Sequence, residues 1–107
     1  MDRRVKEILL RIADEWQKPL SVSELAASVN LGASRLEHLF KTVTRTSIRD
    51  LLRRRRMTEA ARLLISTHRR ISEISYYVGF GDVSNFNHTF RKEFGVSPRE
   101  FRRLHEK

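Results

Sequence analysis

The chain contains two copies of one short sequence pattern, and this repeat limits its possible folds more than any other feature. The segment SELAASVNLG at 23–32 aligns with SEISYYVGFG at 72–81 at a spacing of 49 residues. After one extra residue, LEHLFK at 36–41 aligns with FNHTFR at 86–91 at a spacing of 50, and SIRDL at 47–51 aligns with SPREF at 97–101. A repeat of this kind within 107 residues predicts two copies of one structural unit.

The apolar residues recur at helical spacing, and no alternating run of strand length stands out. Only 4 Gly and 2 Pro interrupt the chain. We therefore predict an all-α fold with two helix-turn-helix subdomains joined by a long central helix. The seven predicted helices span residues 3–16, 22–29, 33–42, 48–66, 71–78, 83–94 and 98–105.

Each copy has the pattern of a helix-turn-helix. A short helix ends at Asn30 or Gly79, residue types that readily adopt the left-handed conformation that turns a chain out of a helix. A second, amphipathic helix follows. Its expected buried residues are Leu36, Leu39 and Phe40 in the first copy, and Phe86 and Phe90 in the second.

Residues that cap helices support these boundaries. Ser21, Ser47 and Ser97 each stand three residues before an acidic residue, which is the capping-box spacing or its Asp variant. Asp82 is the expected cap at the start of helix 83–94, and Gly95 is the expected residue at its end.

These boundaries predict one domain with three parts: 1–46 as the first unit, 47–66 as the linker helix and 67–107 as the second unit. The linker helix would be roughly 28 Å long at 1.5 Å per residue, and we expect it to hold the units at a fixed separation. Its apolar residues are expected to join both cores. We also expect five phenylalanines to lie in the core of the second unit: Phe80, Phe86, Phe90, Phe94 and Phe101.

The charge predicts a polyanionic partner. The chain has 22 Lys and Arg against 13 Asp and Glu, a formal net charge of +9. Such an excess is typical of proteins that bind nucleic acid or an acidic membrane face, although it also occurs as a solubility device. Most of it is arginine, whose planar fork suits phosphates, so nucleic acid is favoured.

Other classes of function find little support. There are no cysteines, which excludes disulfides and thiolate chemistry and fits a cytoplasmic location. The start of the chain lacks the features of a secretion signal, and no apolar run is long enough to span a membrane. The sequence has no HExxH, GxSxG or glycine-rich phosphate loop, so we expect no enzyme, no catalytic residue, no metal and no cofactor.

Polar residues on the second helix of each unit are the candidate DNA contacts. Asn pairs well with adenine, Glu accepts from cytosine, and Val contacts the thymine methyl group. The predicted base-reading residues are Ser34, Glu37, His38, Val83, Ser84, Asn85, Asn87 and His88. The predicted phosphate contacts are Arg35, Lys41, Arg45 and Arg91. Of the RRRR run at 53–56, we expect about half to meet phosphate or the acidic groups of Asp50 and Glu59.

The second copy resembles the signature of the AraC/XylS family of bacterial transcription regulators. The resemblance is carried by Ile74, Val78-Gly79-Phe80, Ser84, Phe86, Phe90-Arg91, Gly95, Ser97-Pro98 and Phe101-Arg102, and it extends from about Val5 to Arg103. It implies an all-α DNA-binding domain whose recognition helices enter successive major grooves of an operator, with RNA polymerase as a further partner. Three positions depart from the family pattern: His88 in place of Arg, Arg45 in place of Gly, and Leu51 in place of Tyr.

The resemblance also implies an effector or dimerisation domain, which nothing in these residues supplies. The chain is therefore expected to be a stand-alone short regulator or an excised C-terminal domain. Two other functions remain open at this point: a nucleic-acid-binding module driven by charge without sequence preference, and a protein-interaction module built on the same helices.

Overall fold

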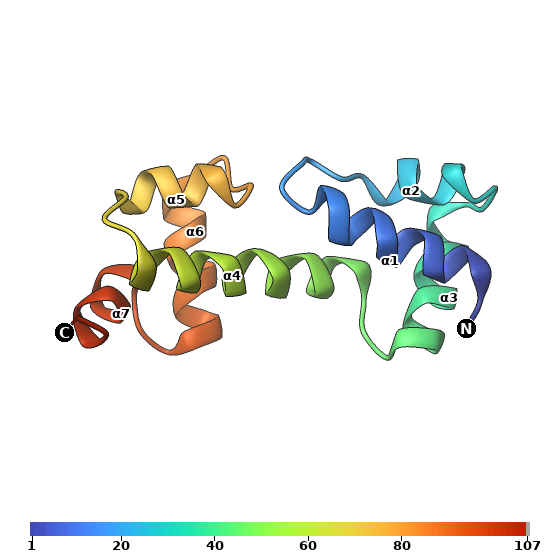
Figure 1. Cartoon of the computed structure of the whole chain (residues 1–107). Coiled ribbons are helices and arrows are strands. Elements are labelled where there is room, and N and C mark those ends of the chain that lie inside the picture. Colours follow the sequence, from blue (N-terminus) through green and yellow to red (C-terminus); the bar gives the residue numbers. More distant parts are fainter. Residues whose placement is uncertain (107) are drawn as a thin grey trace. The chain divides into compact units, whose positions relative to one another are not determined.

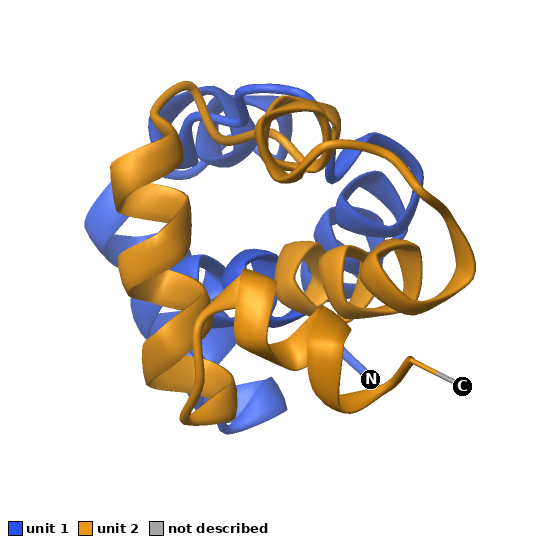
Figure 2. Cartoon of the chain, turned by 90° about the vertical axis from the view of Figure 1, so that its left-hand side faces the viewer, with its two compact units in different colours: residues 1–54 blue, residues 55–107 orange. Residues whose placement is uncertain are grey.

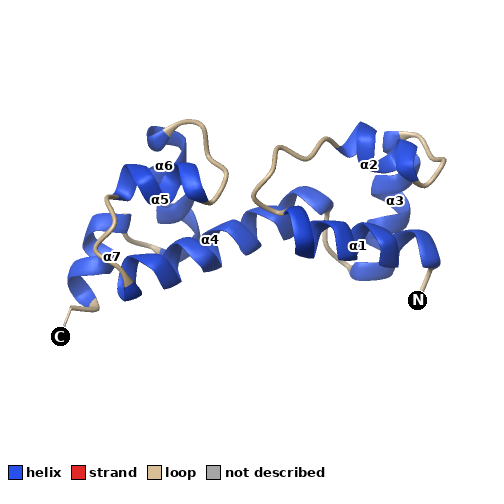
Figure 3. Cartoon of the chain, turned by 45° about the horizontal axis from the view of Figure 1, so that its top comes forward, coloured by secondary structure: helices blue, strands red, loops and turns tan. Residues whose placement is uncertain are grey.

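The structure, a computed structural model, describes residues 1–106, and these form seven α-helices and no strand, as predicted (Figures 1 and 3). The helices are α1 (Arg3–Glu15), α2 (Val22–Ser28), α3 (Ala33–Thr44), α4 (Ile48–Ser66), α5 (Ile71–Tyr77), α6 (Val83–Phe94) and α7 (Pro98–Leu104). Every end lies within two residues of its predicted position. None of these helices is long and apolar enough to cross a membrane.

The chain divides into two compact units, and the boundary falls inside α4 between Arg54 and Arg55 (Figure 2). Helix α4 therefore supplies core residues to both: Ile48 and Leu52 are buried on the first side of the boundary, and Met57 and Leu64 on the second. The division into 1–46, 47–66 and 67–107, and the role of α4 as a spacer, stay predictions.

In unit 1, α3 packs against both α1 and α2. The chain turns between α2 and α3 at Asn30, which adopts the predicted left-handed conformation with φ of 59°. The N–H of Leu31 then donates to the carbonyl oxygen of Ala26 at 2.9 Å, which ties the turn back to α2. The core side chains are Val5, Ile8, Ile12, Trp16, Leu25, Ala26, Val29, Leu36, Phe40, Ile48 and Leu52.

In unit 2, α6 packs against α5 and α7 around a cluster of aromatic rings. Gly79 makes the equivalent turn with φ of 100°, and the N–H of Phe80 donates to the carbonyl oxygen of Ser75 at 2.9 Å. The rings of Phe86 and Phe90 are fully buried, with centroids 5.9 Å apart.

The prediction that all five phenylalanines lie in the core is wrong for Phe94, whose side chain is 37% exposed. Phe94 is the last residue of α6, so it covers the edge of the cluster: one face lies against Phe90 and Phe101, and the other meets solvent. Phe101 is half-buried beside Phe94 and Phe90, and Phe80 is half-buried against Phe86.

The predicted caps are confirmed. The side-chain oxygens of Ser21, Ser47 and Ser97 accept from the backbone N–H three residues on, at 3.4, 3.0 and 3.1 Å. Asp82 accepts from the N–H groups of two residues at the start of α6, at 2.8 and 3.3 Å. These bonds satisfy N–H groups that have no partner within the helix and therefore define where each helix begins.

The structure extends the repeat beyond the aligned segments. Val5, Ile8 and Ile12 are the buried residues of α1, and the second half of α4 buries Met57, Ala60 and Leu64 at the same intervals. Helix α7, with its Ser97 cap and buried Pro98, repeats the start of α4, with its Ser47 and buried Ile48. Helix α4 is thus the last helix of one unit and the first of the other.

Arg102 joins the last helix of unit 2 to the end of α4. Its Nε donates to the carbonyl oxygen of Leu64 at 3.0 Å, and its Nη2 donates to that of Thr67 at 3.3 Å. The last carbonyls of a helix have no partner within it, so this guanidinium caps α4 from a distance along the chain.

We predict that Arg102→Ala lowers the free energy of unfolding by about 1.5–3 kcal/mol, because it removes a charged donor from two partly buried carbonyls. Urea unfolding followed by circular dichroism measures this loss. The matched control is Arg103→Ala, which removes an exposed ion pair with Glu100 and should change stability little. Equal stability of the two variants would contradict the role given to Arg102.

Ser75 is fully buried, and its hydroxyl has no hydrogen-bond partner among the described residues. The repeat places Ala26, also fully buried, at the equivalent position of unit 1. We predict that Ser75→Ala raises the free energy of unfolding by about 1 kcal/mol, and that the reciprocal Ala26→Ser lowers it by a similar amount. A loss of stability in Ser75→Ala, measured by the same urea titration, would show that the hydroxyl is satisfied in solution.

Candidate nucleic-acid interface

Helix α6 is amphipathic, and its buried residues determine which side chains it exposes. Phe86 and Phe90 are completely buried one turn apart. The opposite side of the helix therefore faces outward, and Val83 at its start is half-buried. The predicted contacts that it exposes are Ser84, Asn85, Asn87, His88 and Arg91.

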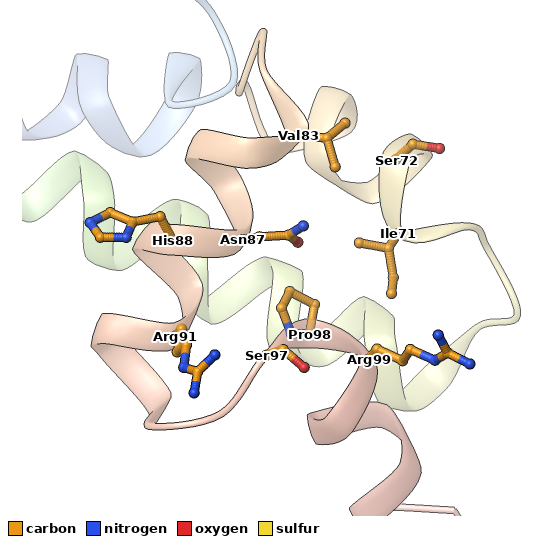
Figure 4. A pocket seen from close by; sticks show the side chains of 9 residues that line it. All are labelled: Ile71, Ser72, Val83, Asn87, His88, Arg91, Ser97, Pro98 and Arg99. Carbon is orange, nitrogen blue, oxygen red and sulfur yellow. The ribbon is translucent and has the colours of Figure 1, made fainter.

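A hollow lies where the start of α5, the outer side of α6 and the start of α7 meet, and Figure 4 shows the side chains that line it. The side chain of Asn87 points into this hollow, between Ile71 and Pro98 (Figure 4). The structure brings four predicted contact residues together here: Val83, Asn87, His88 and Arg91. They offer a methyl surface, an amide, an imidazole and a guanidinium, which are groups that recognise base edges and phosphates.

Ser84 and Asn85 do not line this hollow. Asn85 lies two residues before Asn87, which is roughly 160° around the helix at about 100° per residue. The two asparagines, which the sequence analysis could not tell apart, therefore lie on opposite flanks of α6. Asn87 lies one turn from Val83 and from Arg91, whereas Asn85 lies one turn from His88 on the other flank.

Helix α3 exposes the equivalent face in unit 1, where Leu36 and Phe40 are the buried pair. Leu39, which was expected to be buried with them, is half-buried and lines a hollow. A second hollow lies on one flank of α3, and it brings together the predicted contacts Ser34, Arg35 and His38. Glu37 and Lys41 are exposed but lie outside this hollow, at the positions that Asn87 and Arg91 occupy in the repeat.

Some basic side chains form ion pairs with acidic side chains of the same helix, and others do not. On α4, Arg53 pairs with Asp50 at 2.8 Å and Arg55 with Glu59 at 3.7 Å, as predicted for half of the RRRR run. Hydrogen bonding from Arg62, with the added charge of Arg55, holds the pKa of the Glu59 carboxyl below its usual range. This part of α4 thus neutralises much of its own charge.

The basic residues on and next to α3 and α6 differ from Arg53 and Arg55 in this respect. None of them forms an ion pair with another residue in the described part of the chain, and all are exposed, so their charge is available to a polyanion. They are the predicted Arg35, Lys41, Arg45 and Arg91, together with Arg49 and Arg99.

Three basic residues near this surface were missed by the sequence analysis. Arg99 lines the hollow of unit 2 at the start of α7, and Arg49 is its counterpart at the start of α4. The alignment of SIRDL with SPREF already paired these two arginines and was the signal that could have found them. Arg4 lines the hollow of unit 1 and had no comparable signal, because only the packing of α1 on α3 brings it there.

Comparisons with known proteins agree with this description. A family model described as a helix-turn-helix domain matches residues 25–104. The arabinose operon regulatory protein of Escherichia coli is 35% identical over 103 residues, which cover 95% of this chain and 35% of that protein. This chain spans about a third of the length of the curated relatives that it matches.

Two solved structures resemble the chain closely. The C-terminal domain of AraT, a response regulator from Geobacillus stearothermophilus, has a TM-score of 0.89 at 32% identity, covering 96% of this chain and 86% of that chain. The DNA-binding domain of AdpA, in complex with a target DNA, also has a TM-score of 0.89, covering 97% of this chain and 94% of that chain. Its identity is 21%, so this second likeness concerns the fold.

Arg45 ends α3 in the left-handed conformation, with φ of 66°, where unit 2 has Gly95. A side chain in this conformation costs about 1 kcal/mol relative to glycine. We predict that Arg45→Gly raises the free energy of unfolding by about that amount yet weakens binding to duplex DNA about two- to fivefold through the lost charge. Thermal unfolding and fluorescence anisotropy measure the two effects. Stabilisation without any loss of affinity would remove Arg45 from the phosphate contacts.

Proposed function

The chain belongs to the AraC family of helix-turn-helix transcription regulators and is a DNA-binding domain of that family, and we propose that α3 and α6 are its two base-reading helices. In this proposal the two helices enter successive major grooves of a bacterial operator, with half-sites about one helical turn, roughly 10 bp, apart. The observation that carries it is the repeated exposed face, which has polar side chains over a buried pair in both units.

In unit 2, we assign base reading chiefly to Asn87, His88 and Val83, which line the hollow, and keep Ser84 and Asn85 as further base contacts on the same exposed face. The amide of Asn87 can pair bidentately with an adenine, the imidazole of His88 can donate to a guanine acceptor, and Val83 can contact a thymine methyl group. Arg91 and Arg99 border the same hollow, and we assign them to the phosphates on that side of the groove.

At the position that matches Asn87, unit 1 carries a carboxylate in place of the amide. Glu37 stands where unit 2 has Asn87, and a carboxylate accepts hydrogen bonds but donates none when ionised. A cytosine amino group is the base-edge partner that suits it. The two half-sites should therefore differ in sequence, so that the domain binds its operator in one orientation. Ser34 and His38 complete the proposed base contacts of unit 1.

The alternative of a module driven by charge alone rests on the net charge of +9. Such a module would bind unrelated duplexes with similar affinity and with a steep dependence on salt. It gives no role to the amide of Asn87 or to the carboxylate of Glu37, which occupy matching positions in the two units, whereas base recognition does.

Further partners are proposed on the basis of the family. The relatives that the chain matches are about three times its length. We infer that recognition of an effector, or dimerisation, belongs to regions of such regulators beyond the matched part, and that RNA polymerase is the partner through which a bound domain would act on transcription.

The two asparagines of α6 provide the test. On the preferred duplex recovered from a randomised pool, Asn87→Ala should cost roughly 1–3 kcal/mol of binding free energy, and much less on a scrambled duplex. Asn85→Ala is the comparison, because it removes the same amide from the opposite flank, and we expect it to cost less on the preferred duplex than Asn87→Ala does. Fluorescence anisotropy at fixed salt measures all four values. Equal losses on both duplexes would contradict base reading by Asn87.

A further inference from the structure

The hollow of unit 1 lies on the flank of α3 that faces away from Glu37 and Lys41, and its polar lining is mostly basic. Arg4 reaches it from the start of α1, and Arg35 and His38 border it from α3. The hydroxyl-bearing residues Ser34 and Thr42 complete the polar part of the lining. No carboxylate lines the hollow, and the carboxylate that pairs with Arg4, that of Asp2, lies outside its lining. Because Arg35 has no such partner among the described residues, the charge of the site is net positive and suits an anion.

Asp2 fixes the position of the Arg4 guanidinium. Nε of Arg4 lies 3.4 Å from Oδ1 of Asp2, and Nη2 lies 3.1 Å from Oδ2. The same carboxylate caps α1, because it accepts from the N–H of Arg4 at 2.8 Å and from that of Val5 at 3.3 Å. The arginine is thus oriented by the end of a helix, and the rest of its planar fork stays open to a further acceptor, with the side chain 46% exposed.

A recognition helix in a major groove has two walls beside it. The groove is about 12 Å wide and a helix with its side chains is about 10–12 Å across, so the two flanks of the helix face the two sugar–phosphate strands. The flank of α3 that carries Lys41 corresponds to the side of α6 that carries Arg91 and lies near Arg99. The flank that carries Arg35 and lies beside Arg4 is then left for the other strand.

We propose that Arg4 and Arg35 form a phosphate-binding site for the second strand of the half-site read by unit 1. This inference rests on the proposed function and adds Arg4, from outside the helix-turn-helix, to the DNA contacts. Unit 2 lacks an equivalent pair, because Asn85 stands at the position of Arg35. In this proposal, unit 1 contacts the phosphates of both strands that border its groove, and unit 2 contributes more of the base recognition.

The first test compares Arg4→Ala with Arg3→Ala, the adjacent exposed arginine that does not line the hollow. Arg4→Ala should weaken binding about three- to tenfold on preferred and scrambled duplexes alike, and should reduce the slope of log affinity against log salt by about one. Arg3→Ala should change affinity less than about twofold. The cap of α1 survives in Arg4→Ala, because it uses backbone donors.

Arg35→Gln is the second variant, because it changes an exposed position on α3 and should give the same uniform loss. A single methylphosphonate, which removes the charge of one phosphate, then locates the contact. At one position on the second strand, it should weaken binding by the wild-type chain and have no further effect on Arg4→Ala. The absence of any such position would overturn the proposal.

Inorganic phosphate distinguishes a DNA contact from a site for a free anion. If millimolar phosphate shifts the Nε–Hε resonances of Arg4 while Arg4→Ala leaves DNA affinity unchanged, the hollow binds free anions and the DNA contact is wrong. If the wild-type chain binds no duplex, the proposed function fails. If the wild-type chain binds selectively and Arg4→Ala matches Arg3→Ala, only this inference fails.

Discussion

The burial of two apolar side chains one turn apart on each reading helix is the constraint on which the rest of the structure depends. Leu36 and Phe40 in α3, and Phe86 and Phe90 in α6, are completely buried. Their burial fixes the rotation of each helix about its axis, because turning the helix would expose these side chains at a cost of about 1.5–3 kcal/mol each. The exposed polar face is therefore held in one orientation, which is what positioned contacts with base edges require.

Helix α4 serves both copies of the repeat, because it is the last helix of the first unit and the first helix of the second. Its start supplies the buried Ile48 to the first core, and its second half supplies Met57 and Leu64 to the second. Arg102 then caps its end from α7. A change inside α4 can therefore disturb the cores of both units, whereas a change on the outer face of α3 or α6 leaves both cores intact. This separation lets the exposed residues that we propose read bases differ between units, as Glu37 and Asn87 do, without loss of the fold.

Much of the fold was predictable because its signals are local. Caps such as Ser97, turns such as Gly79 and the spacing of apolar residues depend on neighbours within a few positions, and the structure confirms them. What escaped the sequence depends on tertiary packing. The exposure of Phe94 follows from its place at the margin of an aromatic cluster, and the bonds of Arg102 join groups far apart in the chain. The approach of Arg4 to the reading helix follows from the packing of α1 on α3.

The central claim is that the two units bind two different half-site sequences within one operator. Selection from a pool of randomised duplexes tests this claim most directly. The full chain is used at near-physiological salt, and the bound duplexes are sequenced after repeated rounds. We expect a two-part motif whose halves differ and lie about one helical turn, roughly 10 bp, apart. Binding without enrichment of any motif, or enrichment of a single half-site, would contradict it.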